Sequence, residues 1–285
     1  MTVAIAPLPA LMVEPTVRAA LAEDLGRAGD ITTQAVIPAG TRVRACLKVR
    51  KDGRICGLDY ARMAFRLIDP AIKVATVGND GRDMAGGDTI ATVEGSARAI
   101  LTAERVALNF MGRMSGIATA TRDIVQAISG AKARICCTRK TTPGLRIAEK
   151  YAVRCGGGLN HRFGLDDAVL IKDNHIAIAG GVEKAIRAAR SHIGHLVKVE
   201  CEVDTLAQLR EAIDTGVDAV LLDNMTPERL IKAVRLVNGR AITEASGGVR
   251  PATAAVIAAT GVDLISCGWI THSAPSLDIG LDFEE

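Results

Sequence analysis

The stretch VKVECEVDTLAQLREAIDTGVDAVLLDN, residues 197–224, contains a complete strand–helix–strand unit and decides the fold of the larger part of the chain. Residues 197–202 and 219–223 are short runs rich in Val and Leu, as strands of a covered sheet are. Residues 205–215 between them carry apolar residues at the spacing of an amphipathic helix. Strands that alternate with helices in this way indicate parallel pairing and an α/β architecture.

The same alternation continues on both sides of this unit. Further strand candidates lie at residues 133–138, 168–172, 241–245 and 263–268. Helices fill the gaps, for example at residues 227–237. Because six or seven such units fall short of the eight of a closed α/β barrel, we predict an incomplete barrel.

A domain of another kind precedes the barrel. Its predicted helices cover residues 14–25 and 58–68, with a Gly- and Thr-rich loop at residues 25–33. Its predicted strands, separated by Asp-Gly and Gly-Gly turn signals, are residues 43–51, 72–77 and 89–94. These elements make an α+β domain. A helical segment follows at residues 100–129, and we expect it at an interface between domains or subunits.

The composition excludes several classes of function. A net charge of +3, one Trp, two Tyr and four Phe leave too few cations and aromatic rings for nucleic-acid binding. Residues 1–15 have no basic start and contain three prolines, and no run of about 18 apolar residues occurs, so we expect neither export nor membrane insertion. The seven cysteines include no CxxC pair, which favours reduced thiols in the cytoplasm.

Polar residues gather where the predicted strands end. They are Thr138, Arg139, Lys140, Lys172 to His175, Glu202, Asp223, Asn224, Ser246 to Gly248, and Gly268. One charge at a strand end is usually only solvated, but so many together indicate a site, because the carboxyl ends of barrel strands form the working mouth.

Strand alternation predicts which charges face the barrel interior. In residues 197–203 the apolar side chains share one face, so Lys198, Glu200 and Glu202 point inward. Buried charges are costly unless they are paired or used. We expect structural ion pairs from Lys198 and Glu200, and functional roles for Lys172, Glu202 and Asp223.

The basic residues at the mouth indicate a ligand with several negative charges. They are Arg139, Lys140, His161, Arg162 and Lys172, with Arg105 as a further candidate from the helical segment. The Ser246–Gly247–Gly248 turn before a helix is suited to a phosphate. Glu202 and Asp223 beside these cations suggest a magnesium ion, ribose hydroxyls or a developing positive charge as their partner.

At these residues the sequence resembles the quinolinate phosphoribosyltransferase family. The most specific segment is NHRFGLDDAVLIKDNH at residues 160–175. The other matching segments, in order, are ERVALNFMGRMSGIAT (104–119), TRKTTPGLR (138–146), EASGGV (244–249) and LDIGLDF (277–283). The resemblance spans nearly the whole chain.

The resemblance implies a fold and an assembly. The fold is an N-terminal α/β sandwich, placed at residues 1–112, and a seven-stranded open α/β barrel at residues 113–285, with the extreme C-terminus packing back on the N-terminal domain. The assembly is a homodimer with shared active sites, or a hexamer, and each sandwich caps the barrel of another subunit.

The resemblance also implies a reaction: phosphoribosyl transfer from phosphoribosyl pyrophosphate to quinolinate with Mg²⁺, giving nicotinate mononucleotide, pyrophosphate and CO₂ for NAD biosynthesis. The implied quinolinate contacts are Arg105, from the neighbouring subunit, and Thr138, Arg139, His161, Arg162 and Lys172. The implied phosphoribosyl pyrophosphate contacts are Lys140, Glu202, Asp223, Ser246, Gly247, Gly248, Cys267, Gly268, Trp269 and His272. Among these, Lys140, Glu202 and Asp223 carry the catalytic roles, and Mg²⁺ is held mainly through substrate and water near Glu202 and Asp223. Cys267 and Trp269 are bulkier than the family pattern leads us to expect.

Other functions remain open on the residues alone. The chain could be a phosphoribosyltransferase for another aromatic acid such as nicotinate, like a relative associated with molybdenum-transport operons. It could also be a non-catalytic protein that binds an anionic metabolite, or a barrel whose rim charges form only salt bridges. The inward acids Glu202 and Asp223 favour catalysis, because binding an anion needs only the cations.

Overall fold

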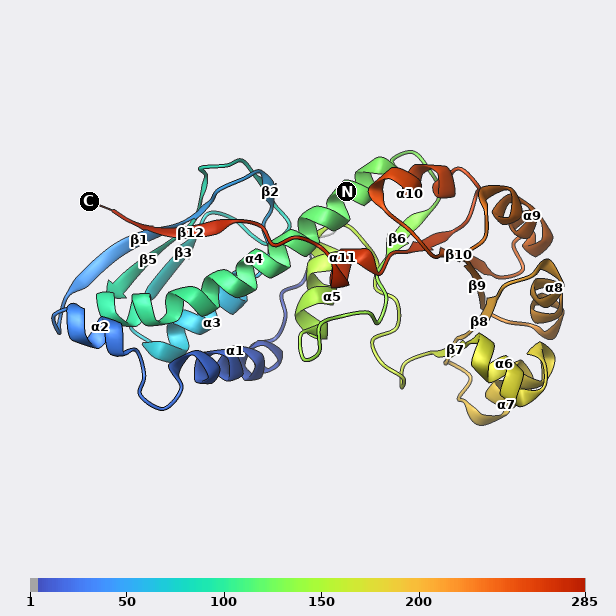
Figure 1. Cartoon of the computed structure of the whole chain (residues 1–285), viewed down its shortest axis with the longest axis horizontal. Coiled ribbons are helices and arrows are strands. Elements are labelled where there is room, and N and C mark those ends of the chain that lie inside the picture. The colour runs from blue at the N-terminus through green and yellow to red at the C-terminus, as the bar shows by residue number, and fades with distance from the viewer. Residues whose placement is uncertain (1–4, 285) are drawn as a thin grey trace. The chain divides into compact units, whose positions relative to one another are not determined.

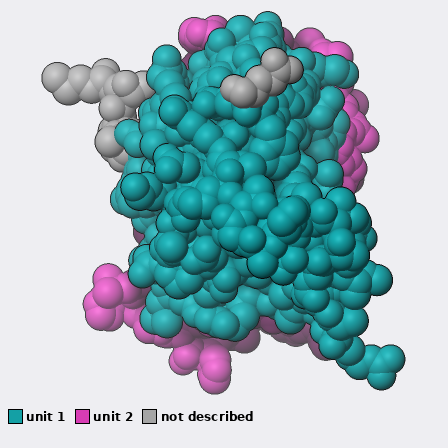
Figure 2. All heavy atoms as spheres, turned by 90° about the vertical axis from the view of Figure 1, so that its left-hand side faces the viewer, with its two compact units in different colours: residues 1–122, 142–157, 274–285 teal, residues 123–141, 158–273 magenta. Residues whose placement is uncertain are grey.

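The computed structural model describes residues 5–284, so the first four residues of the opening segment considered above lie outside it. The chain forms two compact units (Figures 1 and 2). Unit 1 contains the residues up to Arg122, Thr142–Gly157 and the residues from Ala274 onward. Unit 2 contains Asp123–Thr141 and Gly158–Ser273.

Unit 1 is built on an antiparallel sheet of four strands. In spatial order they are β12 (Ile279–Phe283), β1 (Arg42–Val49), β5 (Thr89–Ser96) and β3 (Lys73–Thr76). A separate two-stranded sheet pairs β2 (Gly53–Arg54) with β4 (Asp83–Met84). The last strand of the chain thus pairs with the first, with Leu47 opposite Leu281. On β1, Ala45, Leu47 and Val49 alternate toward the core and are fully buried.

Helices cover one face of this sheet (Figure 1). They are α1 (Ala10–Leu25), α2 (Ile31–Val36), α3 (Leu58–Ile68) and α4 (Ala97–Ala127), of which the last five residues belong to unit 2; α5 (Arg146–Cys155) completes unit 1. The predicted helix at 58–68 is confirmed and buries Tyr60 and Phe65. The predicted loop at 25–33 is wrong in its second part, because the Asp30 side chain accepts a hydrogen bond from Thr33 N–H (2.9 Å) and starts α2.

Unit 2 is built on a six-stranded parallel sheet. Its order is β6 (Arg134–Cys136), β11 (Leu264–Ser266), β10 (Ile242–Ser246), β9 (Ala219–Asp223), β8 (Val199–Val203) and β7 (Val169–Ile171). All six strand candidates of the sequence are therefore confirmed. The sheet has edges at β6 and β7, as an open barrel requires.

The expected seventh strand is reduced to one bridge in the described residues. Leu159 exchanges hydrogen bonds with β6, through Leu159 N–H to the Ile135 carbonyl (2.8 Å) and Cys137 N–H to the Leu159 carbonyl (3.0 Å). The residues before it are Gly156, Gly157 and Gly158, which disfavour an extended strand. The parallel sheet of unit 2 therefore has six strands in the described residues, rather than the expected seven.

The helices of unit 2 follow the strands. They are α6 (Asp173–Ala179), α7 (Val182–His192), α8 (Leu206–Thr215), α9 (Pro227–Val237), α10 (Pro251–Ala258) and α11 (Trp269–His272). Thr205 caps α8 in a capping box with Gln208, and Thr226 caps α9 before a proline at its first position. Within residues 5–284, no helix combines the length and the apolar composition needed to cross a bilayer.

Charges at the amino ends of the strands tie neighbouring strands together. Asp218, before β9, accepts hydrogen bonds from Val199 N–H of β8 (2.9 Å) and from the Lys198 ammonium (2.8 Å). Asp263, before β11, accepts from Thr243 N–H of β10 (2.9 Å). The prediction that Lys198 points into the barrel is wrong, because β8 begins at Val199 and the Lys198 side chain is 77% exposed. The structural ion pair expected of Lys198 does exist, with Asp218 at the amino end of the strands.

Candidate active site

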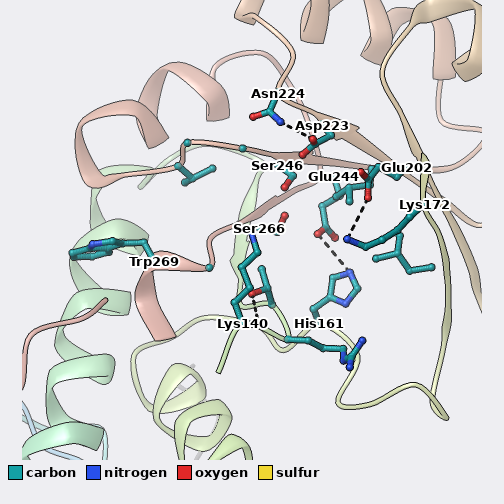
Figure 3. A pocket seen from close by; sticks show the side chains of 18 of the residues that line it. Lys140, His161, Lys172, Glu202, Asp223, Asn224, Glu244, Ser246, Ser266 and Trp269 are labelled. Atoms are coloured by element: carbon teal, nitrogen blue, oxygen red, sulfur yellow. Dashed lines mark hydrogen bonds and ion pairs between the residues drawn. The ribbon is translucent and has the colours of Figure 1, made fainter. Parts of the chain in front are cut away.

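A cavity of about 470 Å³ opens in unit 2 at the carboxyl ends of the strands (Figure 3). This volume lies within the usual range for small-molecule sites. The cavity is lined by Thr138, Arg139, Lys140, His161, Arg162, Leu170, Lys172, Glu202, Leu221, Asp223, Asn224, Glu244, Ser246, Gly247, Gly248, Val249, Arg250, Ser266, Gly268, Trp269 and His272. Five Lys and Arg side chains against three carboxylates make it a site for anions.

One side of the cavity carries His161, Lys172 and Glu202, as Figure 3 shows. His161 is fixed by two hydrogen bonds: Arg162 N–H donates to its Nδ1 (2.8 Å), and its Nε2 lies 2.9 Å from Glu200 Oε2. The ring proton therefore sits on Nε2 and is donated to Glu200. The Arg162 guanidinium donates to the Ala168 carbonyl (3.0 Å), and burial together with Arg139 lowers the pKa of Arg162. Because the Arg139 and Arg162 guanidinium groups repel each other, an anion bound between them would be favoured.

The acids predicted to act in catalysis end two neighbouring strands. Glu202 Oε2 lies 3.7 Å from Lys172 Nζ. Burial raises the pKa of Glu202, an effect that Lys172 opposes and Asp223 reinforces. Asp223 Oδ2 accepts a hydrogen bond from the Asn224 side-chain amide (2.6 Å). Both carboxylates line the cavity, as the strand-end argument predicted.

The glycine turn after β10 is shaped by its neighbour Asn224. Gly247 has φ +99° and Gly248 φ +60°, a backbone conformation that side chains other than glycine rarely adopt. A Cβ on Gly247 would also lie 2.1 Å from Asn224 Oδ1. Asn224 N–H in turn donates to the Ser246 carbonyl (2.9 Å). Asn224 therefore joins Asp223 to the turn, a role that the sequence argument did not assign.

The turn after β11 brings three more predicted residues together. A Cβ on Gly268 would lie 3.1 Å from Lys140 Cδ, 3.3 Å from His272 Cδ2 and 3.3 Å from Thr138 Oγ1. The Thr271 hydroxyl donates to the Lys140 carbonyl (2.8 Å) and fixes this approach. A side chain at position 268 would therefore press on Lys140 and His272, which converge there.

Two predicted residues do not line the cavity. The Cys267 side chain is 1% exposed and its Sγ–H donates to the Val249 carbonyl (3.4 Å), because Ser266 and not Cys267 faces the cavity. Arg105 lies on α4 in unit 1, where its side chain is exposed. Its role across subunits stays a prediction.

The sequence argument missed Glu244, which lines the cavity. It expected an inward Glu200 in a structural ion pair, and Glu200 forms one with His161. Glu244 is 3% exposed and Glu200 8% exposed, and the Oε1 atom of each is buried without a hydrogen-bond partner among the described residues. Glu244 Oε1 lies 3.7 Å from His161 Nε2. Burial, and then repulsion by Glu200, raise the pKa of Glu244 to about 7. The signal for Glu244 was present, since it stands two residues before Ser246 on the same face of β10.

The fold and the cavity define an anion-binding protein of the open α/β-barrel class, with acids set among the cations. Two family models match the chain: the N-terminal domain of quinolinate phosphoribosyl transferase over residues 30–115, and its C-terminal domain over residues 117–282. This chain belongs to the quinolinate phosphoribosyl transferase family.

Individual relatives agree with the family models. The carboxylating nicotinate-nucleotide pyrophosphorylase of Mycobacterium leprae is 46% identical over 272 residues, 94% of this chain and 95% of that protein. The probable enzyme of the same name from Bacillus subtilis is 43% identical over 260 residues, 91% and 89% of the two chains. The solved nicotinate-nucleotide pyrophosphorylase of Francisella tularensis has a TM-score of 0.94 at 40% identity and covers 100% of both chains.

Proposed function

We propose that this chain transfers the phosphoribosyl group of phosphoribosyl pyrophosphate to quinolinate with loss of CO₂, giving nicotinate mononucleotide and pyrophosphate in NAD biosynthesis. The observation that carries the proposal is one cavity that combines a cationic side with two acids beside a glycine turn, in a member of this family. Arg139, His161, Arg162 and Lys172 would hold the two carboxylates of quinolinate, with Thr138 beside them. Lys140, Gly268, His272 and the Ser246–Gly248 turn would hold phosphoribosyl pyrophosphate.

The transfer step needs positioning and electrostatics rather than a base. The pyridine nitrogen already carries a lone pair and attacks the ribose carbon as pyrophosphate leaves. Lys140 and the backbone N–H groups of the turn stabilise the negative charge of the departing pyrophosphate. Glu202 and Asp223 stabilise the positive charge that develops on the ribose.

Magnesium fits the residues at this end of the cavity. The hard carboxylate oxygens of Glu202 and Asp223 are of the kind that Mg²⁺ prefers, and Mg²⁺ is commonly held jointly by carboxylates, water and substrate phosphates. When bound, it supplies positive charge to the pyrophosphate leaving group.

Decarboxylation follows from the chemistry of the transferred ring. Once the nitrogen is bonded to ribose, its positive charge stabilises the electron pair that stays on the ring carbon as CO₂ leaves, and this carbon then takes up a proton from water to give nicotinate mononucleotide. The second carboxylate must stay, so the Arg139 and Arg162 guanidinium groups hold it in place.

We also propose a homodimer, or a hexamer built from it, in which Arg105 enters the site of the neighbouring subunit. A reducing compartment such as the cytoplasm suits the seven cysteines, which are all free and buried. One relative, a tobacco quinolinate phosphoribosyltransferase, is named as mitochondrial.

One assay tests the reaction against its alternatives. Protein, phosphoribosyl pyrophosphate and Mg²⁺ are mixed with quinolinate or with nicotinate, and release of CO₂ and of pyrophosphate is measured. We expect both products with quinolinate. Pyrophosphate release with nicotinate alone would establish the other aromatic-acid activity, and binding without any release would establish a metabolite-binding protein.

A further inference from the structure

Arg250, which none of the roles above uses, forms a pair with Trp269 on the wall of the cavity. The guanidinium carbon of Arg250 lies 5.6 Å from the centroid of the Trp269 ring, within cation–π distance. Both residues line the cavity, and each directly follows a turn assigned to phosphate: Arg250 stands two residues after Gly248, and Trp269 stands next to Gly268.

Arg250 is the N-cap residue of α10. Its side chain is exposed, and within residues 5–284 it has no ion-pair partner. Arg190 and Arg240 of unit 2 do have such partners, Asp218 and Asp214. Arg210 and Arg235 are also exposed without an ion pair in the described part of the chain, so Arg250 is distinguished by its place in the cavity lining. An unpaired cation on the wall of an anion site is free to bind the ligand.

Trp269 limits the positions that this cation can take. Figure 3 shows the indole on the side of the cavity away from Lys172 and Glu202, and the ring is half-buried. A guanidinium over an indole face keeps its edge N–H groups available for hydrogen bonds, since the contact uses the flat face. Restricting a flexible arginine in this way lowers the entropy cost of binding.

We infer that Arg250, held by Trp269, is a further binding residue for the pyrophosphate group of phosphoribosyl pyrophosphate, and that Trp269 is its positioning residue. This inference rests on the proposed function. Lys140 and His272 converge at Gly268, directly before Trp269, so Arg250 supplies one more cation to the same group. Arginine suits the task because its fork of N–H groups matches two phosphate oxygens at once.

The location of the pair predicts a selective kinetic effect. Arg250 lies at Trp269, and Figure 3 shows the predicted quinolinate contacts His161 and Lys172 on the other side of the cavity from Trp269. Loss of Arg250 should therefore raise the KM for phosphoribosyl pyrophosphate and leave the KM for quinolinate and kcat within about twofold. A charge-assisted hydrogen bond of ordinary strength corresponds to about a tenfold increase in KM.

Trp269 is the only tryptophan of the chain, so its fluorescence reports directly on this wall. Inorganic pyrophosphate with Mg²⁺ is titrated into the wild type and into Arg250→Ala and Arg250→Lys. We expect a saturable change in the wild type, about tenfold weaker binding in Arg250→Ala and an intermediate loss in Arg250→Lys, because an ammonium lacks the planar fork. Variants without the tryptophan are measured by calorimetry instead. Trp269→Phe should bind pyrophosphate more tightly than Trp269→Ala, because phenylalanine keeps an aromatic face.

Arg235→Ala, at an exposed position near the end of α9, is the matched control and should leave both KM values unchanged. An unchanged affinity for pyrophosphate in Arg250→Ala would overturn the inference, as would an equal rise of both KM values. The titration needs no quinolinate. A wild type that binds pyrophosphate through Arg250 but does not convert quinolinate would therefore refute only the proposed reaction.

Discussion

Replacing Glu244 by Gln is expected to make the protein more stable, and increasingly so as the pH rises. Glutamine has the size of the protonated acid but cannot ionise. Burial, and then repulsion by the neighbouring Glu200, raise the pKa of Glu244 from 4.5 to about 7. Each pKa unit corresponds to about 1.4 kcal/mol, so ionising Glu244 in the folded state costs about 3 kcal/mol more than in the unfolded chain.

The pH window follows from the sign of this change. A carboxyl whose pKa is raised by folding binds its proton more tightly in the folded state. The contribution of protonated Glu244 to the free energy of unfolding is therefore complete below pH 4.5 and is lost as the pH rises to about 7. The difference in unfolding free energy between Glu244→Gln and wild type should therefore be below about 1 kcal/mol at pH 5 and reach about 3 kcal/mol at pH 8.

Urea unfolding at the two pH values measures the difference. The fluorescence of Trp269, which lies in unit 2 with Glu244, follows the transition of the relevant unit. Glu183→Gln, an exposed acid on α7, serves as control and should show a small difference at both pH values. If Glu244→Gln gives the same difference at pH 5 and pH 8, Glu244 is not held protonated and the reasoning fails.

Three further substitutions test the site. Glu202→Gln should lower kcat by tenfold or more and change the KM values little, because its charge acts on the developing ribose cation; steady-state kinetics with an unchanged kcat would remove it from catalysis. Gly247→Ala should weaken binding of phosphoribosyl pyrophosphate by about tenfold or more, because a Cβ meets Asn224 and the positive φ costs about 1–3 kcal/mol; calorimetry giving wild-type affinity would contradict this. Mixed dimers of inactive Arg105→Ala and inactive Lys172→Ala should regain activity if Arg105 acts across subunits, and no recovery after verified subunit exchange would place it in its own subunit's site.

The sequence predicted the strands of unit 2 well because each is a short apolar run between helical segments, two of which have strong caps. Helices α8 and α9 could be predicted from local sequence, because each begins with a capping signal: Thr205 with Gln208, and Thr226 with Pro227. Helix α2 was not readable, because its start depends on one side-chain hydrogen bond from Asp30 within a segment that otherwise looks like a loop.

The candidate site was predictable where a residue stands at the end of a strand. Glu202 and Asp223 follow from strand alternation, and both line the cavity. The contact of His161 with Glu200 was not predictable, since the two residues are 39 positions apart and meet only through the barrel. Cys267 was assigned only through the family resemblance; its side chain is buried outside the cavity lining, which Ser266 joins instead.

The carboxylates of Asp218 and Asp263, at the amino ends of the strands, help to set the strand alignment that places the site residues at the carboxyl ends. Each one accepts a main-chain N–H of the adjacent strand, so it fixes β9 against β8 and β11 against β10. A slip of one residue would turn Glu202 and Asp223 toward the outer helices, because successive side chains alternate in direction. Two acids far from any substrate thereby set the alignment on which the chemistry depends, and sequence variation at these positions should disturb turnover as well as folding.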